Sequence, residues 1–173
     1  MKKPGTLENL ANTAYLAIGS NLGNKINNIE ITKSNLEKYK IKILKCSSNY
    51  ISQSWPDISK PKYINIVIKI KTDLTAIELL KICNQIELRL GRVRTTINAP
   101  RKCDIDIVDY NMKISNKNNQ QLILPHPRMN TRNFVLLPLF EIEKTWKHPK
   151  LRVNIVKLIN SLPAEDLRSI KQL

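Results

Sequence analysis

The sequence predicts an α+β fold, and three stretches carry this prediction. Residues 63–71 place isoleucine at every even position and mostly polar side chains at the odd ones, which is the alternation of a half-buried strand. Thr75 and Glu78 have the spacing of a capping box, and they open an apolar stripe of helical period that stops at Gly91. Residues 104–110 are predicted as the strand that follows this helix.

The first part of the chain gives weaker patterns. Residues 14–18 are a short apolar run that ends in a Gly-Ser-Asn turn, which indicates a strand. A helix is expected next, capped by Asn24 or Asn27 and continuing to about Tyr39. A loop is expected at residues 53–62.

Residues 41–52 are rich in β-forming side chains and are predicted as the second strand. A period of two places Ile41, Ile43 and Lys45 on one face and Leu44 and Cys46 on the other. The resulting order, β-α-β-β-α-β, is that of the ferredoxin-like fold, in which an antiparallel sheet carries both helices on one face. The opposite face is then expected to be open for ligands.

Further elements are expected after this core. A short strand is predicted at residues 122–124, and helices are predicted at 131–142 and 153–162. Residues 1–13 show no such pattern and are expected to be a loose N-terminal extension, so that 14–173 form a single domain. The expected architecture is a ferredoxin-like core with strand and helical additions towards its C-terminal end.

The composition fits one globular domain, since 42% of the 173 residues are hydrophobic. No apolar run approaches the roughly 20 residues of a membrane span, and no signal-peptide core follows Met1. Cys46, Cys83 and Cys103 are widely spaced and there are two histidines, which favours neither a disulfide framework nor a zinc site. We therefore expect a cytoplasmic protein. The chain is too short for a second fused domain, so we also expect it to be monofunctional, and we expect a monomer.

The formal net charge of +15 suggests attraction to nucleic acid. Its distribution weakens that interpretation, because 21 of the 29 basic residues are lysines spread along the chain. The arginines are distributed differently, since six of the eight lie between positions 89 and 132. A planar guanidinium matches phosphate oxygens, so the arginine cluster indicates a phosphate site rather than general basicity.

Asp104 and Asp106 lie inside this arginine-rich region. In a strand, side chains two residues apart point to one face about 7 Å apart, so both carboxylates would face one site while Ile105 and Ile107 face the core. A Mg²⁺ ion bound by carboxylates and substrate phosphates fits such a pair. A lone Asp-x-Asp is more often a solvated strand face. The chain has four glycines and no Walker or Rossmann loop, so metal ions and arginines would have to neutralise bound phosphates.

Five stretches of the chain occur together in the order and spacing of a known family. They are AIGSNLG at 17–23, YIN at 63–65, QIELRLGRVR at 85–94, PRKCDIDI at 100–107 and PHPRMNTRNFVL at 125–136. Together they resemble 6-hydroxymethyl-7,8-dihydropterin pyrophosphokinase. The resemblance implies transfer of the β,γ-pyrophosphoryl group of ATP to the hydroxymethyl group of the pterin, with release of AMP, in folate biosynthesis.

The resemblance also implies roles for single residues. The catalytic positions are Arg92, Arg101, Asp104 and Asp106, of which the two aspartates match the ligands of two Mg²⁺ ions. The ATP-contacting positions are Gln85, Glu87, Arg94, Ile107, His126 and Arg132, and the pterin-contacting positions are Asn21, Tyr63, Asn65 and Phe134. The implied partners are ATP and the hydroxymethyl-dihydropterin, with no nucleic acid and no membrane.

Each of these roles has a plain structural alternative. Tyr63 could be an ordinary exposed strand residue, although the alternation places it on the open face. Phe134 could be a core residue. Gln85 and Glu87 could lie on a solvated helix face, and His126 could serve only to shape a proline-flanked turn.

Two loops depart from the family pattern. Residues 52–56 read SQSWP where many members carry Thr-Pro, and Asn98-Ala99 stand where Trp-Gly is usual. A tryptophan at a mobile loop tip helps to close a site, so slower closure is expected here. A degenerate pterin- or ATP-binding relative is therefore one alternative. A single-stranded RNA-binding module of similar strand order is another, although the chain lacks its stacking aromatics.

Overall fold

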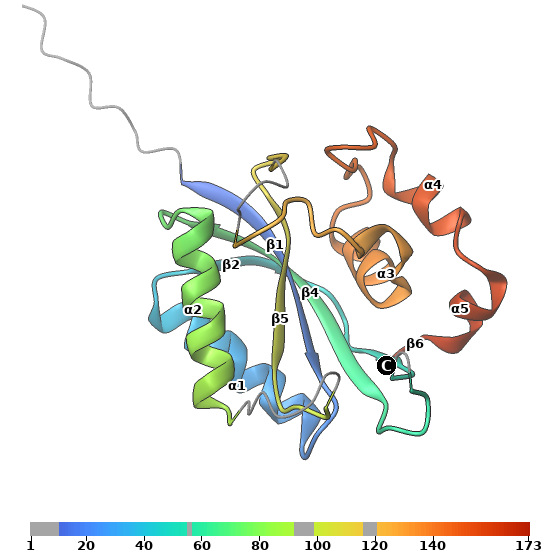
Figure 1. Cartoon of the computed structure of the whole chain (residues 1–173), viewed down its shortest axis with the longest axis horizontal. Coiled ribbons are helices and arrows are strands. Elements are labelled where there is room, and N and C mark those ends of the chain that lie inside the picture. Colours follow the sequence, from blue (N-terminus) through green and yellow to red (C-terminus); the bar gives the residue numbers. More distant parts are fainter. Residues whose placement is uncertain (1–10, 55–56, 92–98, 116–120) are drawn as a thin grey trace, which may run out of the picture.

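An antiparallel sheet whose strands differ in length lies at the centre of the molecule (Figure 1). The structure, a computed structural model, describes residues 11–54, 57–91, 99–115 and 121–173. The strands of this part of the chain are β1 (Asn12–Ser20), β2 (Lys42–Cys46), β3 (Tyr50–Ser52), β4 (Tyr63–Thr72), β5 (Asp104–Tyr110) and β6 (Lys171–Gln172). Their order across the sheet is β5-β1-β4-β3-β6, and β2 also pairs with β4.

Helices cover both faces of this sheet (Figure 1). The first two, α1 (Lys25–Lys38) and α2 (Ala76–Arg89), pack on one face and complete the predicted βαββαβ order. On the other face, α3 packs against β4 and α4 packs against α3. The later elements are η1 (Met129–Thr131), α3 (Asn133–Ile142), α4 (Ile155–Asn160) and α5 (Ala164–Ser169). The ferredoxin-like core is confirmed, but these elements occupy part of the face that was expected to be open.

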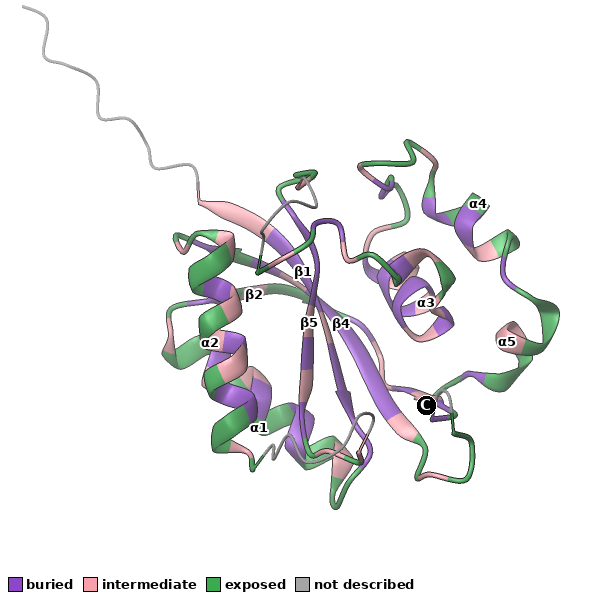
Figure 2. Cartoon of the chain, in the orientation of Figure 1, coloured by how far each residue is buried: buried purple, intermediate pink, exposed green. Residues whose placement is uncertain are grey.

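The side-chain alternation of β4 feeds two separate cores. Its even-numbered isoleucines lie in the cluster shared with α1 and α2, whereas Val67 lies in the cluster shared with α3. Figure 2 shows the central strands as largely buried, which agrees with cover on both faces. The predicted capping box of α2 is present, because Thr75 Oγ1 accepts from the Glu78 amide and Glu78 accepts from the Thr75 amide. Asn24 rather than Asn27 caps α1.

The prediction of one strand over residues 41–52 was wrong in two respects. The stretch forms two strands, β2 and β3, and β2 contains a bulge. Ile43 and Lys45 pair with the consecutive residues Ile70 and Lys69 of β4, so they point to opposite faces. A bulge adds one residue to a strand, and this extra residue breaks the period of two on which the prediction relied.

The prediction of a strand at residues 122–124 was also wrong. Leu124 and Leu122 bond instead to Ser115, whose amide donates to the Leu124 carbonyl at 2.9 Å. The strand added after the core is β6, which pairs with β3. β1 begins at Asn12, two residues before the expected start. Within the described ranges, no helix is long and apolar enough to cross a membrane.

Glu141 attaches α3 to the sheet. Its carboxylate accepts hydrogen bonds from the Ser48 amide at 3.0 Å and the Ser48 hydroxyl at 2.8 Å. It also accepts from the Tyr50 hydroxyl at 2.9 Å. Burial, followed by the contact with Glu141, raises the pKa of Tyr50, so the phenol stays protonated and continues to donate. The same helix begins with Asn133 and Phe134, so this attachment orients its first turn.

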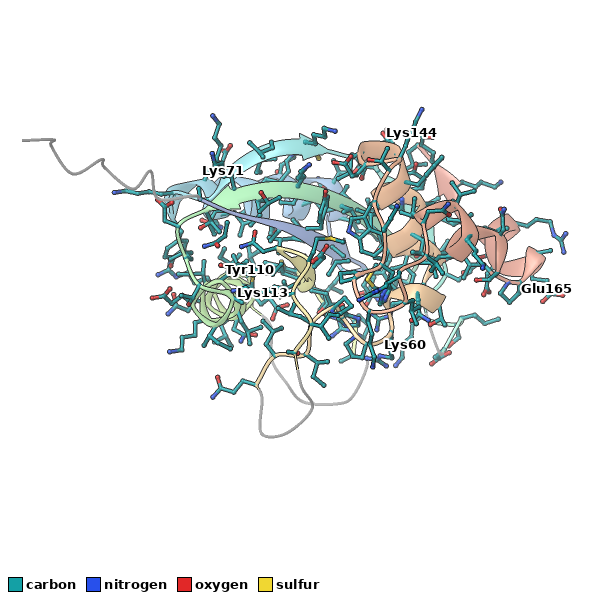
Figure 3. All side chains as sticks on the ribbon, turned by 90° about the horizontal axis from the view of Figure 1, so that it is seen from above. Lys60, Lys71, Tyr110, Lys113, Lys144 and Glu165 are labelled. Carbon is teal, nitrogen blue, oxygen red and sulfur yellow. The ribbon has the colours of Figure 1, made fainter. Side chains whose placement is uncertain are left out.

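Replacing Glu141 with alanine is expected to lower the free energy of unfolding by about 2–3 kcal/mol, because three donors lose a charged acceptor. Urea unfolding followed by circular dichroism measures the loss. Lys144→Ala is the matched control, since Lys144 is exposed just beyond the end of α3 (Figure 3), and its effect should stay within about 0.5 kcal/mol. Equal effects of the two substitutions would contradict the attachment.

Candidate active site

Strand β5 presents two carboxylates on one face of the sheet. Asp104 and Asp106 are partly exposed, whereas Ile105 and Ile107 are buried in the core on the side of α1 and α2. The alternation predicted for this strand is confirmed. Both carboxylates line one cavity.

Each carboxylate has an arginine beside it. Arg132 Nη1 lies 3.0 Å from Asp106 Oδ2, and Arg101 Nη1 lies 3.5 Å from Asp104 Oδ1. Burial acts to lower the pKa of Arg101, but Asp104 and the Tyr63 hydroxyl outweigh it, so the pKa is raised. The two guanidinium groups balance the negative charge on β5.

His126 approaches Asp106 from the turn before η1. Its amide donates to the Val108 carbonyl at 2.9 Å, which attaches the turn to β5. Its Nδ1 accepts from the Arg128 amide at 3.2 Å, so the neutral ring carries its proton on Nε2, which lies 3.6 Å from Asp106 Oδ2. Burial lowers the pKa of His126 against the opposing attraction of Asp106, which favours the neutral ring at pH 7.

Tyr63 and Asn65 extend from β4 towards the same cavity. Asn65 Nδ2 donates to Ser52 Oγ at 2.8 Å, and Arg101 Nε donates to the Tyr63 hydroxyl at 3.1 Å. Gly19 of β1 leaves space for both, because a Cβ there would lie 2.9 Å from Asn65 Oδ1 and 3.3 Å from Tyr63 Cδ1. The glycine therefore permits the packing of the two side chains.

Asn21 holds together three loops around the cavity. Its side-chain Oδ1 accepts from the backbone amide of Arg101 at 2.7 Å, and its backbone amide donates to the Arg101 carbonyl at 3.1 Å. Its Nδ2 reaches Ser54 Oγ at 3.4 Å and the Pro61 carbonyl at 3.3 Å. Asn21 is not among the residues that line the cavity. These hydrogen bonds show that Asn21 organises the loops, and its contact with the pterin stays a prediction.

The cavity between these elements has a volume of about 670 Å³, within the range of small-molecule sites. Phe134 at the start of α3 lines it, and the Arg132 guanidinium carbon lies 5.4 Å from the centre of the Phe134 ring. The lining combines small residues, carboxylates, arginines and aromatic rings. It includes Ala17, Gly19, Ser52, Ser54, Tyr63, Asn65, Arg101, Asp104, Asp106, Arg128, Arg132, Asn133, Phe134, Asp166 and Ser169.

Some predicted site residues lie away from this cavity. Gln85 is exposed and accepts from the Tyr39 hydroxyl at 3.3 Å. Glu87 is 3% exposed, so it does not belong to a solvated helix face, and it accepts from the Ile105 amide at 2.7 Å. The Ile107 side chain lies in the core. The predicted catalytic Arg92 and ATP-contacting Arg94 lie outside the described residues.

Several residues at the cavity carried no predicted role. Arg128 had a sequence signal, since it belongs to the arginine cluster and follows His126 by two positions. Asn133 lies in the last of the five stretches that resemble the family but was given no role there. Asp166 and Ser169 had no signal, because only tertiary packing brings the region of α5 to the start of α3.

Asp104 and Asp106 offer two carboxylates, the kind and number of protein ligands that commonly hold a hard divalent cation such as Mg²⁺. Asp104 and Asp106 have side chains 26% and 35% exposed, so solvent and ligand oxygens can reach them. Among the described residues, no group of three or more His, Cys, Asp or Glu side chains could hold a metal by itself. Mg²⁺ is commonly held by one or two carboxylates together with water and substrate phosphates, and this donor set matches that pattern.

Residues 15–144 match the family model of 7,8-dihydro-6-hydroxymethylpterin-pyrophosphokinase (HPPK). The chain is 39% identical over 132 residues to 2-amino-4-hydroxy-6-hydroxymethyldihydropteridine pyrophosphokinase of Bacillus subtilis, covering 76% of this chain and 78% of that protein. It is 35% identical over 170 residues to the folic acid synthesis protein fol1 of Pneumocystis carinii, covering 98% of this chain. The chain spans only 22% of the length of that relative.

Solved structures with a similar fold include the Plasmodium falciparum HPPK-DHPS A437G protein with pteroate. The TM-score is 0.73 at 17% sequence identity, covering 96% of this chain and 47% of that chain. At this identity the similarity establishes the fold. The sequence matches over most of the chain establish the family: the chain belongs to the 7,8-dihydro-6-hydroxymethylpterin-pyrophosphokinase family.

Proposed function

We propose that this chain transfers pyrophosphate from ATP to 6-hydroxymethyl-7,8-dihydropterin, giving the pterin diphosphate and AMP. Family membership supports the class of reaction. The observation that carries the proposal for this chain is that Asp104 and Asp106 share one cavity with Tyr63, Asn65 and Phe134. Groups suited to phosphates and groups suited to a flat heterocycle therefore line the same space.

In this proposal, the pterin lies near Tyr63, Asn65 and Phe134. The two aromatic rings offer faces for stacking. Asn65 Nδ2 is already engaged by Ser52 Oγ, which leaves Asn65 Oδ1 to accept a hydrogen bond. The ring N–H and the amino group of a pterin are donors of the matching kind, so Asn65 would recognise that edge of the ring.

The phosphates of ATP would lie against Asp104 and Asp106, which would hold the two proposed Mg²⁺ ions. When bound, these ions neutralise and orient the reacting phosphates. The arginines supply further positive charge: Arg101 and Arg132 lie against the two carboxylates. Arg128 lines the same cavity, and its guanidinium makes no ion pair with the described carboxylates. Its charge is therefore available for phosphate.

The reaction then needs alignment more than covalent participation by the protein. The pterin hydroxyl oxygen attacks the β-phosphorus of ATP and loses its proton to water. The bond from that phosphorus to the oxygen bridging it to the α-phosphorus breaks, and AMP leaves with that oxygen. Fixed positive charge around the cavity would stabilise the charge that develops on the transferring group. His126, neutral and with Nε2–H directed at Asp106, is proposed to support the ATP end of the site.

The direct test is AMP formation from ATP by the purified chain. We expect AMP only when Mg²⁺ and the hydroxymethyl-dihydropterin are both present, and chelation by EDTA should abolish it. Binding of both substrates without AMP would identify a degenerate relative and contradict the proposed reaction. Saturable, salt-dependent RNA binding without turnover would favour the RNA-binding alternative instead.

Asp104→Ala and Asp106→Ala are each expected to lower kcat/KM by about 10²- to 10³-fold or more, because charge stabilisation at the transferring group is lost. Circular dichroism should show that the fold is retained. Asp73→Ala is the matched control, since Asp73 is exposed and does not line the cavity. Wild-type turnover in both cavity variants would exclude the proposed metal anchor.

Arg128→Ala is expected to raise the KM for ATP by about tenfold, the effect of losing one charge-assisted contact of about 1.4 kcal/mol. The KM for the pterin should change little, because Tyr63, Asn65 and Phe134 are untouched. Steady-state kinetics with each substrate varied in turn separates the two constants. Arg89→Ala, on the exposed side of α2, serves as the control, and an ATP effect as large as that of Arg128→Ala would contradict a specific role for Arg128.

A further inference from the structure

The segment after α4 forms one wall of the cavity. Asp166 and Ser169, both from α5, line it beside Asn133. We call residues 163–173 the C-terminal strap. It comprises α5 and β6 and runs from the end of α4 back to the edge of the sheet (Figure 1). The strap lies beyond residues 15–144, the stretch that matches the family model.

The middle of the strap is tied to the first residue of α3. Asn133 is 9% exposed, and its Nδ2 donates to the Asp166 carbonyl at 2.5 Å and to Ser169 Oγ at 3.2 Å. Ser169 Oγ in turn donates to the Asp166 carbonyl at 2.8 Å. The Asn133 amide group is thus directed at the strap rather than at the centre of the cavity.

The far end of the strap is paired with β3. Residues of β6 pair antiparallel with Tyr50 and Ile51. The Leu173 amide donates to the Asn49 carbonyl at 2.8 Å, and Gln172 Nε2 donates to Ser48 Oγ at 2.9 Å. Ile170, which joins α5 to β6, is 7% exposed, so the junction between the two elements is also buried.

The two attachment points of the strap adjoin the proposed pterin site from different sides. Asn133 is followed directly by Phe134. β3 ends at Ser52, which accepts the hydrogen bond that orients Asn65. We propose that the C-terminal strap, through the Asn133 amide and the β6–β3 pairing, sets the spacing between Phe134 and Asn65 and thereby the affinity for the pterin. Asn133 is then a positioning residue, and the inference rests on the proposed function.

The phosphate end of the cavity should be insensitive to the strap. Asp104 and Asp106 are held by β5, which pairs with β1 at the opposite edge of the sheet from β6. Of their arginine neighbours, Arg101 comes from the loop before β5. Arg132 is next to Asn133 in the chain, but its side chain is held separately by the 3.0 Å contact with Asp106. Loosening the strap is therefore expected to weaken binding of the pterin but not of ATP, whereas general loss of structure would weaken binding of both.

The test uses two variants of the full chain that release the strap at different points. Asn133→Ala removes the tether to α3. Gln172→Ala combined with Leu173→Pro removes the two donors that hold the strap to residues 48–49. Both should raise the KM for the pterin by about five- to tenfold, the size expected for lost hydrogen bonds. The KM for ATP and kcat at saturating pterin should stay within about twofold.

Arg168→Ala is the control, because this exposed side chain is on the strap but makes none of the tethering bonds. Unchanged KM for the pterin in both release variants would overturn the inference. So would an equal rise in the two KM values, which would indicate general destabilisation. Absence of AMP formation by the wild-type chain would overturn the proposed function itself. That assay uses no variant, so its failure is distinguished from failure of the strap inference.

Discussion

The site depends on the register of β1 between β4 and β5. Gly19 of β1 is opposite Asn65 of β4 on one side and Asp104 of β5 on the other. Two residues earlier, Ala17 is opposite Asp106. Neighbouring strands lie about 4.8 Å apart, so this register brings the acidic pair and the amide of β4 onto one face, with only small side chains between them. A slip of one residue would send these groups to the other face, where α1 and α2 pack.

Asp104 and Asp106 lie beside Gly19 and Ala17 on the same face of the sheet. Their like charges repel each other, which disfavours this arrangement. The structure offsets this repulsion with Arg101 and Arg132, each placed against one carboxylate. Under the proposed function, cations and phosphates enter this same network: the carboxylates would exchange guanidinium partners for Mg²⁺, and the arginines would turn to the phosphates. The same two aspartates and two arginines would then balance one another in the free protein and balance Mg²⁺ and phosphate in the complex with ATP.

The sequence predicted those parts of the fold that depend on local pattern. The alternation of residues 63–71 and the capping box of α2 are confirmed, because each is decided within a few residues. The bulge within residues 41–52 could not be predicted, since it is decided by pairing with β4. Glu87 is buried because the start of β5 packs against it, where the Ile105 amide donates to its carboxylate. Likewise, Asn133 acquires its role from a strap more than 30 residues later in the chain, and no local pattern reports such a contact.

Crystallography with Mn²⁺ and a non-hydrolysable ATP analogue would show whether the acidic pair of β5 anchors the metal and the phosphates. Mn²⁺ takes the same oxygen ligands as Mg²⁺, and its anomalous scattering locates it without ambiguity. We predict anomalous peaks in direct contact with the carboxylates of both Asp104 and Asp106, with the phosphates of the analogue on the same ions. Peaks elsewhere, with Arg101 and Arg132 still paired to the two carboxylates, would show that Asp104 and Asp106 do not hold the metal.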